Sequence, residues 1–551
     1  MSIPTRWRRP LAGIAVAAAA TLALAACSTG ATAGSSSSAS APDKPVEGGD
    51  LTFLIQGYDA GFVSSKSSIS SYEGNLWGEI TDKLVYVDPK GTISPWIATS
   101  WDQSSDAKHF TLHLKKGVTF SDGEKLDAAA VVDNLNIWAK GDPSRGITKV
   151  GLFPGSTYVG AVATDDHTVT VDFSAPALGF IPTLGYHGTI LLSPKTLALP
   201  LDQQADLTKE IGSGPYTVAS VEQGEKYVLK KRADYEWGPK ALGHTGPAYI
   251  DTITYKVIKD ESVRTQAVTA GQAQVSFNVE PQEIDSLKSQ GFTVDTPRYL
   301  GFTDGFQVNT TATPTSDPAV RQAIQIGIDR KAILKTVYTS DWQAATSFLQ
   351  GNVPEVGDYS SLLAYDPDKA EKLLDAAGWT TGTDGIREKD GAPLEFSLSP
   401  NPYVPSTQAE DELIAQQLKK IGIKVDLKIT DVSGYAAVAA SHPPLYQTSR
   451  SFVDVGTVAG VLTSQNNGED WFRLGTSDSK LDDLSTQIAT ASDETTRTKV
   501  ADELQQYVLQ QGYFIPTVQL VQRLYLIAPS VKGVSYNGLA YANFYSAWIA
   551  K

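Results

Sequence analysis

The sequence predicts a mixed α/β fold, and two patterns support this prediction. Several short segments alternate apolar and polar residues with a period of two, which is typical of half-buried strands. Segments with a helical period lie between them, and several begin at an aspartate that can cap a helix. The chain has 551 residues, 41% of them hydrophobic, which is enough for about three or four domains.

The predicted strands each place alternate apolar side chains on one face, so each is expected to cover a core from one side. The first is expected directly after a polar N-terminal stretch, and the last alternates aliphatic with charged residues. In chain order they are 51–56, 110–114, 169–173, 253–257 and 423–429, the last through Ile423, Val425, Leu427 and Ile429.

Three helices can be placed from their ends. Asp127, Asp317 and Asp366 are expected N-caps, and proline follows the last two, where the first helical turn tolerates it. Gly378 is expected to end the third helix. The apolar faces are Val131, Leu135 and Trp138 in the first, Val320, Ala323 and Ile324 in the second, and Ala370, Leu373, Leu374 and Ala377 in the third.

The N-terminal segment has the features of an export signal. Three arginines among the first ten residues precede an uncharged stretch, 11–23, and small residues lead to Cys27. The tetrapeptide Leu-Ala-Ala-Cys resembles the lipobox of bacterial lipoproteins, in which the cysteine is acylated and becomes the first mature residue. We therefore predict a signal peptide over 1–26, a lipid anchor on Cys27 and a serine-rich flexible tether over 27–47.

Charge and cysteine content exclude several classes of protein. The chain has 46 basic and 61 acidic residues, a net charge of −15 that opposes binding to nucleic acid. Its single cysteine excludes a disulfide framework, a cysteine-rich zinc module and an iron–sulfur cluster. Of the six histidines, only His109 and His113 could share a strand face, and a solvated pair is the more common arrangement. We expect no cofactor, no resident metal and no nucleic-acid partner.

Five stretches of the sequence carry a family pattern. They are LVYVDPKGTISPWIATSW (84–101) with KHFTLHLKKGVTFSDGEKLDAAAVV (108–132), then GSGPYTV (212–218), DESVRTQAVTAGQAQV (260–275), PAVRQAIQIGIDRKAIL (318–334) and YDPDKAEKLLDAAGW (365–379). In this order they resemble the family 5 extracytoplasmic solute-binding proteins of bacterial ABC importers, the group of dipeptide-, oligopeptide- and nickel-binding receptors. One departure is Gln274, which stands where the family usually has an aspartate.

The resemblance implies a two-lobed periplasmic-binding-protein-like fold with an additional inserted α/β domain. It also implies a monomer outside the cell that passes a small solute to ABC permease subunits and their ATPases. Peptides or other amine-bearing compounds are the first ligands to consider, with opine-like compounds, chelated nickel and oligosaccharides as alternatives. The implied division is 48–72, 188–297 and 520–551 for lobe I, 73–187 for the inserted domain and 298–519 for lobe II.

The resemblance further indicates ligand-binding residues. Peptide-binding members hold the ligand amine with an aspartate in a W-x-x-D-Y-x-x-P stretch, and Asp454 falls on that position, although the tryptophan, tyrosine and proline are absent. Phe452 belongs to the same stretch, and Arg450 could form a bidentate pair with a ligand carboxylate. A capping or surface role for Asp454, a core role for Phe452 and a solvated Arg450 are the alternatives.

Three further candidates are expected near the cleft. Tyr58 and Asp59 follow the first strand, where the first lobe of this family faces its ligand. Trp471 follows a polar loop and could form an aromatic wall of the site, although a core position is the alternative.

An enzyme is the main competing function, either a secreted cell-wall hydrolase or a penicillin-binding-type lipoprotein. Two S-x-x-K tetrads begin at Ser105 and Ser477, but neither S-D-N nor K-T-G accompanies them. The sequence also lacks G-x-S-x-G, a phosphate-binding glycine loop and H-E-x-x-H. A structural or adhesive surface protein would show repeats, which are absent. We therefore predict a binding protein without enzymatic activity.

Overall fold

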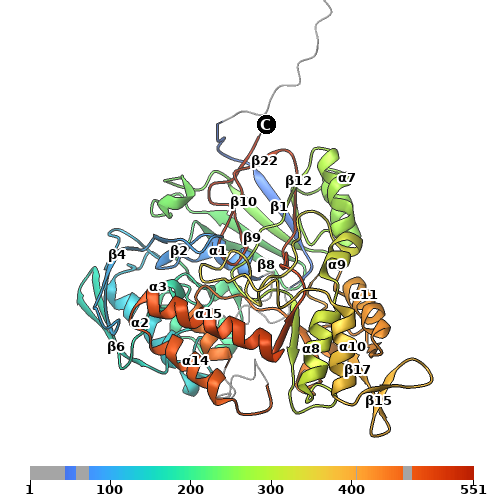
Figure 1. Ribbon diagram of the computed structural model, residues 1–551. Helices are drawn as coiled ribbons and strands as arrows, with labels where there is room; N and C mark the ends of the chain where they lie inside the picture. The colour runs from blue at the N-terminus through green and yellow to red at the C-terminus, as the bar shows by residue number, and fades with distance from the viewer. Residues whose placement is uncertain (1–43, 58–72, 405, 463–473, 551) are drawn as a thin grey trace, which may run out of the picture. The chain divides into compact units, whose positions relative to one another are not determined.

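The structure is a computed structural model that describes residues 44–57, 73–404, 406–462 and 474–550. These residues belong to one compact unit, Pro42–Lys551, in which strands and helices mix along the chain (Figure 1). The predicted mixed α/β class is confirmed. Within the described ranges, none of the helices combines the length and the apolar character that crossing a bilayer requires.

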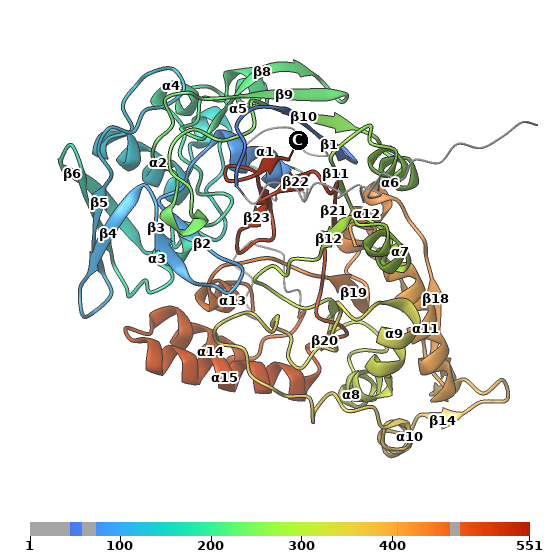
Figure 2. The same cartoon turned by 90° about the horizontal axis from the view of Figure 1, so that it is seen from above.

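The largest sheet has seven strands, and Figure 2 shows most of them following one another across the molecule. β1 lies at its centre and runs parallel to both β10 and β11, whereas the remaining pairings are antiparallel. The predicted strands at 51–56 and 253–257 are therefore confirmed. The order is β12 (Thr293–Asp295), β21 (Tyr525–Ile527), β11 (Val275–Phe277), β1 (Asp50–Ile55), β10 (Thr252–Val257), β9 (Lys226–Lys231) and β8 (Tyr216–Glu222).

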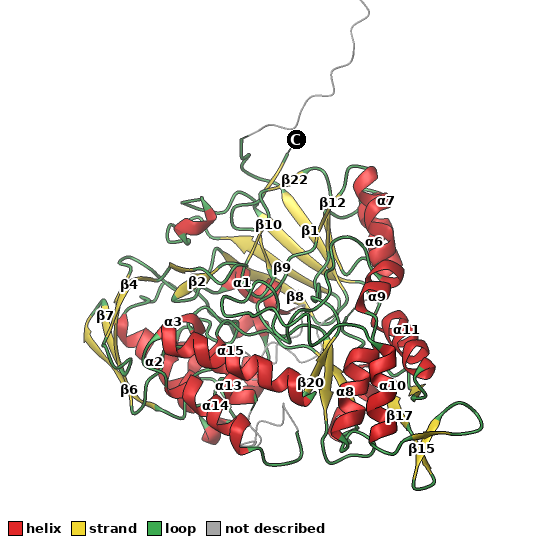
Figure 3. Cartoon of the chain, in the orientation of Figure 1, coloured by secondary structure: helices red, strands yellow, loops and turns green. Residues whose placement is uncertain are grey.

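Helices and aromatic side chains cover this sheet. α6 (Glu261–Thr269) packs on β11 and β21, and α7 (Ile284–Ser289) packs on β12, as the red helices beside the sheet in Figure 3 show. α1 (Glu73–Ile80) contacts β8. The centre of the core is Phe53, which is fully buried and whose ring lies 5.4 Å from that of Tyr255 and 5.8 Å from that of Phe544.

A second sheet is antiparallel and has four strands, and one helix packs on its inner face. The predicted strands at 110–114 and 169–173 are its central pair, and Phe110 and Val171 are buried as expected. Asp127 caps the helix by accepting a hydrogen bond from the Ala130 N–H group, and Trp138 is buried. The elements are β4 (Ala98–Gln103), β5 (His109–Leu114), β7 (Thr168–Phe173), β6 (Tyr158–Asp165) and α2 (Ala128–Lys140).

The outer face of the four-stranded sheet carries two histidine–aspartate pairs. His109 Nδ1 lies 2.7 Å from Asp172 Oδ1, and His113 Nε2 lies 2.9 Å from Asp102 Oδ2. Both pairs are exposed, and the described residues contain no cluster of three or more metal-ligating side chains.

The C-terminal half contains the other two predicted helices. Asp317 and Asp366 cap them as expected, and Gly378 follows the second with a left-handed φ of 84°. These helices, α8 (Pro318–Gly327) and α10 (Pro367–Ala376), pack against each other. Nearby elements are α9 (Arg330–Val337), α11 (Thr407–Lys420), the sheet of β19 (Leu445–Thr448), β13 (Gly305–Val308) and β20 (Phe514–Pro516), and the parallel pair β17 (Glu395–Leu398) and β18 (Lys424–Leu427).

One strand prediction is wrong at its end. β18 stops at Leu427, whereas the alternation of aliphatic residues extends to Ile429. Ile429 is 58% exposed, because the chain leaves its single pairing partner, β17, and turns toward α12 (Val432–Ala440). Apolar periodicity alone could not show where the pairing ends.

Several helices and short strands complete the described structure. α13 (Val455–Val461), α14 (Ser479–Thr490) and α15 (Glu494–Gln511) form a packed group near the C-terminus. The short elements are β2 (Val85–Val87), β3 (Ile93–Pro95), α3 (Phe180–Thr183), α4 (Pro194–Leu197), α5 (Leu201–Gln204), β14 (Thr380–Thr381), β15 (Arg387–Lys389), β16 (Ala392–Pro393), β22 (Val531–Lys532), β23 (Ser535–Tyr536), β24 (Ala542–Asn543) and β25 (Trp548–Ile549).

The chain passes twice between the seven-stranded sheet and the C-terminal half. The first passage runs from β12 to β13, and the second runs from β20 to β21. Both are buried, since Tyr299 and Leu520 are fully inaccessible to solvent and pack in one hydrophobic cluster.

Candidate functional site

A polar groove lies where three parallel strands of the seven-stranded sheet end. Because β1, β10 and β11 run in the same direction, their carboxyl ends meet at one edge, which is where open α/β sheets bind ligands. The groove has a volume of about 300 Å³. One wall consists of residues that follow these strands: Gln56, Lys259, Glu261, Arg264, Asn278, Val279 and Glu280.

The opposite wall comes from the C-terminal half, mainly from the loop 400–404 and the start of α11. Buried hydrogen bonds hold this loop in place. The Asn401 N–H group donates to Gln447 Oε1 at 3.0 Å, and Gln447 Nε2 donates to Asp304 Oδ2 at 2.9 Å. The groove is therefore formed by two parts of the protein that are distant in sequence.

Two carboxylates give the groove its electrostatic character. Burial, reinforced by the negative charge of Glu280, raises the pKa of Glu261 to about 7. Burial also raises the pKa of Glu280. Glu261 Oε1 accepts a hydrogen bond from the Glu280 N–H group at 3.2 Å, and Glu280 Oε2 accepts one from the Ser406 hydroxyl at 3.4 Å. A cationic ligand group would stabilise both ionised carboxylates.

Arg264 supports the groove from within the fold. It is 1% exposed, and its guanidinium donates to the carbonyls of Phe277, Ile258 and Lys259 at 2.8 to 3.1 Å. These carbonyls lie at the ends of β10 and β11, so Arg264 fixes the backbone from which both glutamates project.

One of the predicted ligand residues, Phe452, belongs to the core, and a second, half-buried Arg450, is bound to it through the backbone. Phe452 is 1% exposed, and its ring lies 5.4 Å from that of Phe302. The Arg450 carbonyl accepts a hydrogen bond from the Phe302 N–H group at 2.8 Å, which ties this stretch to the first passage between the halves. Neither residue lines the polar groove.

Asp454 lies in a different cavity, of about 290 Å³, between α13, α15 and the segment 149–183. Its Oδ2 lies 2.7 Å from Arg497 Nη2, and its Oδ1 accepts a hydrogen bond from the Gly456 N–H group at 2.7 Å. Arg497 also lies 3.3 Å from Glu355, so three charged side chains form one buried network. A contact between Asp454 and a ligand stays a prediction.

Tyr58, Asp59, Trp471 and Cys27 lie outside the described residues. Glu261 and Glu280 are not among the residues that the sequence patterns indicate as ligand-binding. Glu261 could have been suspected, because it is an acidic residue four positions beyond the end of a predicted strand. Glu280 offered no such signal, since it follows β11, a strand of three residues that is too short to show alternation.

The two parts of the molecule are joined by two chain passages, and a groove lies between them at strand ends. This arrangement is typical of a two-lobed binding protein. The chain belongs to the bacterial extracellular solute-binding proteins, family 5, whose middle region matches residues 92–472. The resemblance described from the sequence is thereby confirmed, and with it the prediction that this is a binding protein rather than an enzyme.

Two curated relatives illustrate the match. Di/tripeptide-binding protein 1 of Pseudomonas aeruginosa is 27% identical over 401 residues, covering 69% of this chain and 71% of the relative. The glutathione-binding protein GsiB of Escherichia coli is 25% identical over 495 residues, covering 87% of this chain and 89% of the relative.

Solved structures confirm the two-lobed fold. NikA from Brucella suis, in complex with Fe(III)-EDTA, superposes with a TM-score of 0.77 at 23% identity and covers 91% of this chain and 100% of its own. A dipeptide-binding protein from a Pseudoalteromonas species, in complex with Met-Leu, gives a TM-score of 0.77 at 18% identity with the same coverage.

Proposed function

We propose that this protein is the lipid-anchored receptor of an ABC importer and that it captures an amine-bearing solute, with short peptides as the first class to test. The observation that carries this proposal is the groove between the two halves, in which Glu261 and Glu280 stand at strand ends and form no ion pair within 4.0 Å among the described residues. An ammonium group would supply the missing charge. The names of the relatives, which include di/tripeptide- and glutathione-binding proteins, favour the same class.

Capture is proposed to couple to closure of the lobes. Lobe I would comprise 48–72, 188–297 and 520–551, lobe II would comprise 298–519, and 73–187 would be inserted. A ligand that touches both walls of the groove binds the closed arrangement better than an open one, so its binding shifts the population toward closure. The closed receptor would then be recognised by the permease.

The anchor is proposed to be a lipid on Cys27. Two or more acyl chains would hold the protein firmly at the membrane, whereas one chain gives only marginal retention. Mass spectrometry of the membrane-extracted protein tests this directly. An unmodified Cys27, or a mature N-terminus elsewhere, contradicts the anchor.

The binding proposal is tested by calorimetric titration of the purified protein with a set of tripeptides. Glu280→Gln should weaken binding about tenfold or more, because a charged hydrogen bond contributes about 1.5–3 kcal/mol. Glu503→Gln is the matched control, since Glu503 is a 52% exposed carboxylate on α15 that does not line the groove. The proposal is wrong if peptides, chelates and sugars all fail to bind, or if Glu280→Gln binds amine-bearing ligands as the native protein does.

A further inference from the structure

Three carboxyl groups are buried behind the C-terminal wall of the groove. Asp304, Glu410 and Asp411 are fully buried, and none of them lines the groove or the cavity beside Asp454. Four of their carboxyl oxygens form no hydrogen bond, namely Asp304 Oδ1, Glu410 Oε1 and both oxygens of Asp411. The three side chains also act on one another electrostatically, so they form one buried carboxyl cluster.

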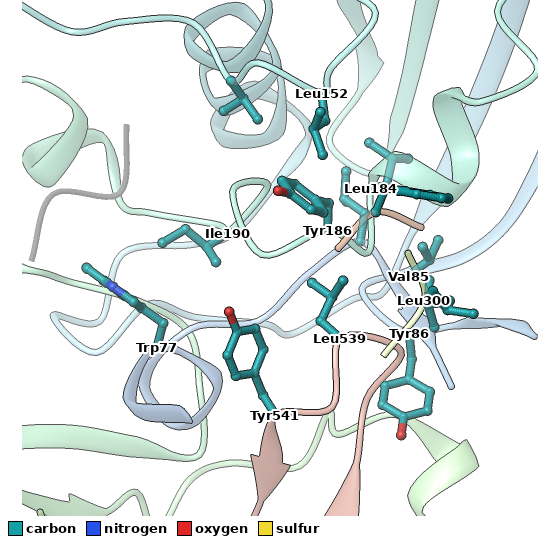
Figure 4. Close-up of a cluster of buried hydrophobic side chains, with 14 of the residues drawn as sticks. Trp77, Val85, Tyr86, Leu152, Leu184, Tyr186, Ile190, Leu300, Leu539 and Tyr541 are labelled. Atoms are coloured by element: carbon teal, nitrogen blue, oxygen red, sulfur yellow. The ribbon is translucent and has the colours of Figure 1, made fainter. Parts of the chain in front are cut away.

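Most buried side chains elsewhere in the molecule are apolar or aromatic. In the group that Figure 4 shows, Leu184, Ile190 and Leu539 lie among tyrosine and tryptophan rings, and Leu300 joins this group from the first passage between the halves. A little further along the same segment, Asp304 instead brings a carboxyl group into the interior. The buried carboxyl cluster therefore departs from the usual content of this core.

The cluster has more acidic groups than nearby cations. Within the described ranges, no lysine, arginine or histidine nitrogen lies within 4.0 Å of any of the three carboxyl groups. Arg330, at the start of α9, faces Glu410, but its guanidinium donates to four backbone carbonyls. The other titratable groups that face the cluster are tyrosines: Tyr338 at the end of α9, Tyr435 on α12 and Tyr299 in the first passage.

Burial keeps most of these carboxyl groups protonated, because a buried carboxylate without a counterion costs more than a neutral acid. Burial, reinforced by the charge of Glu410, raises the pKa of Asp304 and of Asp411 well above 3.8. Burial also raises the pKa of Glu410, although Tyr338 and Arg330 oppose this shift. One guanidinium compensates at most one negative charge, so the folded protein holds about two protons in the cluster at neutral pH.

Hydrogen bonds connect the cluster to the groove. On one side, Gln447 Nε2 donates to Asp304 Oδ2 at 2.9 Å, and Gln447 Oε1 accepts the Asn401 N–H group at 3.0 Å. On the other side, the two acidic residues of α11 lie near its start, where the Thr407 hydroxyl donates to the Asn401 carbonyl at 2.8 Å. Asn401 belongs to the loop 400–404 of the groove wall, so this loop has two supports that both depend on the cluster.

We propose that the buried carboxyl cluster is a proton-dependent support of the groove wall, which holds the loop 400–404 in place while it keeps its protons and releases the loop when it ionises. Asp304 precedes β13, whereas the other two carboxyl groups belong to α11. Like charges on both segments would push the start of α11 away from Gln447. Asn401 is bonded to both sides and would then lose one of its two bonds.

This inference concerns the regulation of the proposed site and rests on the proposed function for the ligand, but not for the proton count or for the movement of the loop. Glu261 in the groove attracts an amine when it is ionised, and the cluster supports the wall when it is protonated. The receptor then holds its ligand best where both conditions are met, and releases it as the surroundings become more alkaline.

The first test counts protons in the ligand-free full-length protein by urea unfolding at a series of pH values. The folded pKa values lie above the ordinary 3.8 and 4.5, so the stability from the neutral cluster is fully present below about pH 4 and is lost as pH rises. Each proton that the folded state retains lowers the folding equilibrium constant by about tenfold per pH unit.

Asp411→Asn should remove one such proton and reduce this pH dependence by about tenfold per pH unit. Glu410→Gln keeps an acceptor for the Tyr338 hydroxyl and should act in the same way. Glu412→Gln is the matched control, because Glu412 is the next residue on α11 and is exposed, so the pH dependence should stay as in the native protein. The proposal is wrong if the cluster variants and Glu412→Gln show the same pH dependence.

Hydrogen exchange tests the loop itself. The protection of the Asn401 N–H group, relative to intrinsic exchange at the same pH, should fall as pH rises, and Asp411→Asn should remove this fall. The Gly141 N–H group, which donates to the Ile137 carbonyl at 2.8 Å at the end of α2, is the reference and should keep its protection. Protection of Asn401 that is independent of pH, or that falls equally in Asp411→Asn, overturns the proposal.

The last test compares tripeptide affinities of the native protein and Asp411→Asn. Their ratio should be close to one in mild acid and should favour the variant by about tenfold or more at alkaline pH. Glu261 is present in both proteins, so its own ionisation cancels in the ratio. A ratio of one at every pH contradicts the proposal. If no peptide binds, the proposed function fails, but exchange at Asn401 still decides the role of the cluster.

Discussion

The polar groove and the cavity beside Asp454 are similar in size, but they differ in ion pairing. The carboxylates beside the cavity face an arginine, whereas those of the groove form no ion pair within the described residues. Their volumes are about 300 and about 290 Å³, and each is lined by segments far apart in the sequence. In the cavity, Asp454 and Glu355 both face Arg497. In the groove, Glu261 and Glu280 form hydrogen bonds to an N–H group and a hydroxyl but no ion pair within the described residues.

This difference is what we expect between a structural network and a proposed binding site. A network that already contains its counterion holds two parts of the chain together and gains little from a ligand. Carboxylates that are partly desolvated and lack a cation gain much from one. This contrast supports the proposal that the ligand binds in the groove; a contact between Asp454 and a ligand stays a prediction. Three variants test this comparison.

The largest effect is expected where the cavity network is broken. Arg497→Met leaves Asp454 and Glu355 buried without their cation, and should lower the free energy of unfolding by about 3–5 kcal/mol. Urea unfolding measures the change. Lys499→Ala is the control on the same helix, because Lys499 is 78% exposed and should contribute less than about 0.5 kcal/mol. Equal, small effects of both variants would show that the network does not stabilise the fold.

A smaller loss is expected at Gly179, which borders the same cavity. A Cβ atom at this position would lie 2.5 Å from Asp454 Oδ1, so Gly179→Ala should displace the carboxylate and lower stability by about 1–3 kcal/mol. Gly160→Ala is the control, since no atom lies within 4 Å of its added Cβ. Thermal unfolding distinguishes the two. A Gly179→Ala protein as stable as the control would mean that this contact is loose.

The smallest effect concerns the pH dependence of the groove. The folded pKa of Glu261, about 7, lies above its ordinary value of 4.5, so its ionisation opposes folding. The stability that neutral Glu261 contributes to the fold is fully present below about pH 4.5 and is lost as pH rises toward 7. Glu261→Gln should therefore flatten the decline in urea midpoint over this range. The native protein should bind an amine-bearing ligand more tightly as pH rises through 7, and this gain in affinity should be smaller in Glu261→Gln. Identical pH profiles of the affinity in the two proteins would contradict this account.

Local patterns predicted local structure well. Asp127, Asp317 and Asp366 each cap the helix that was expected, because a cap depends on a side chain and an N–H group only two or three residues away. Ile429 was assigned wrongly, because strand ends depend on a partner strand from another part of the chain.

The site was harder to predict for the same reason. Glu261 and Glu280 are 19 residues apart in sequence and meet only because β10 and β11 both flank β1 in the sheet. Arg523 has aromatic neighbours from two separate parts of the chain, Tyr299 and Tyr541. A sequence shows which residues carry charge, but it does not show which of them will be buried without a counterion.

The sequence by itself determined the mixed α/β class, the capped helices and the likeness to a solute-binding family, since these depend on short-range periodicity and on motifs that are continuous along the chain. Only the tertiary structure decided which charges are compensated. Burial and ion pairing depend on which segments meet in space, and here those segments come from both halves of the chain.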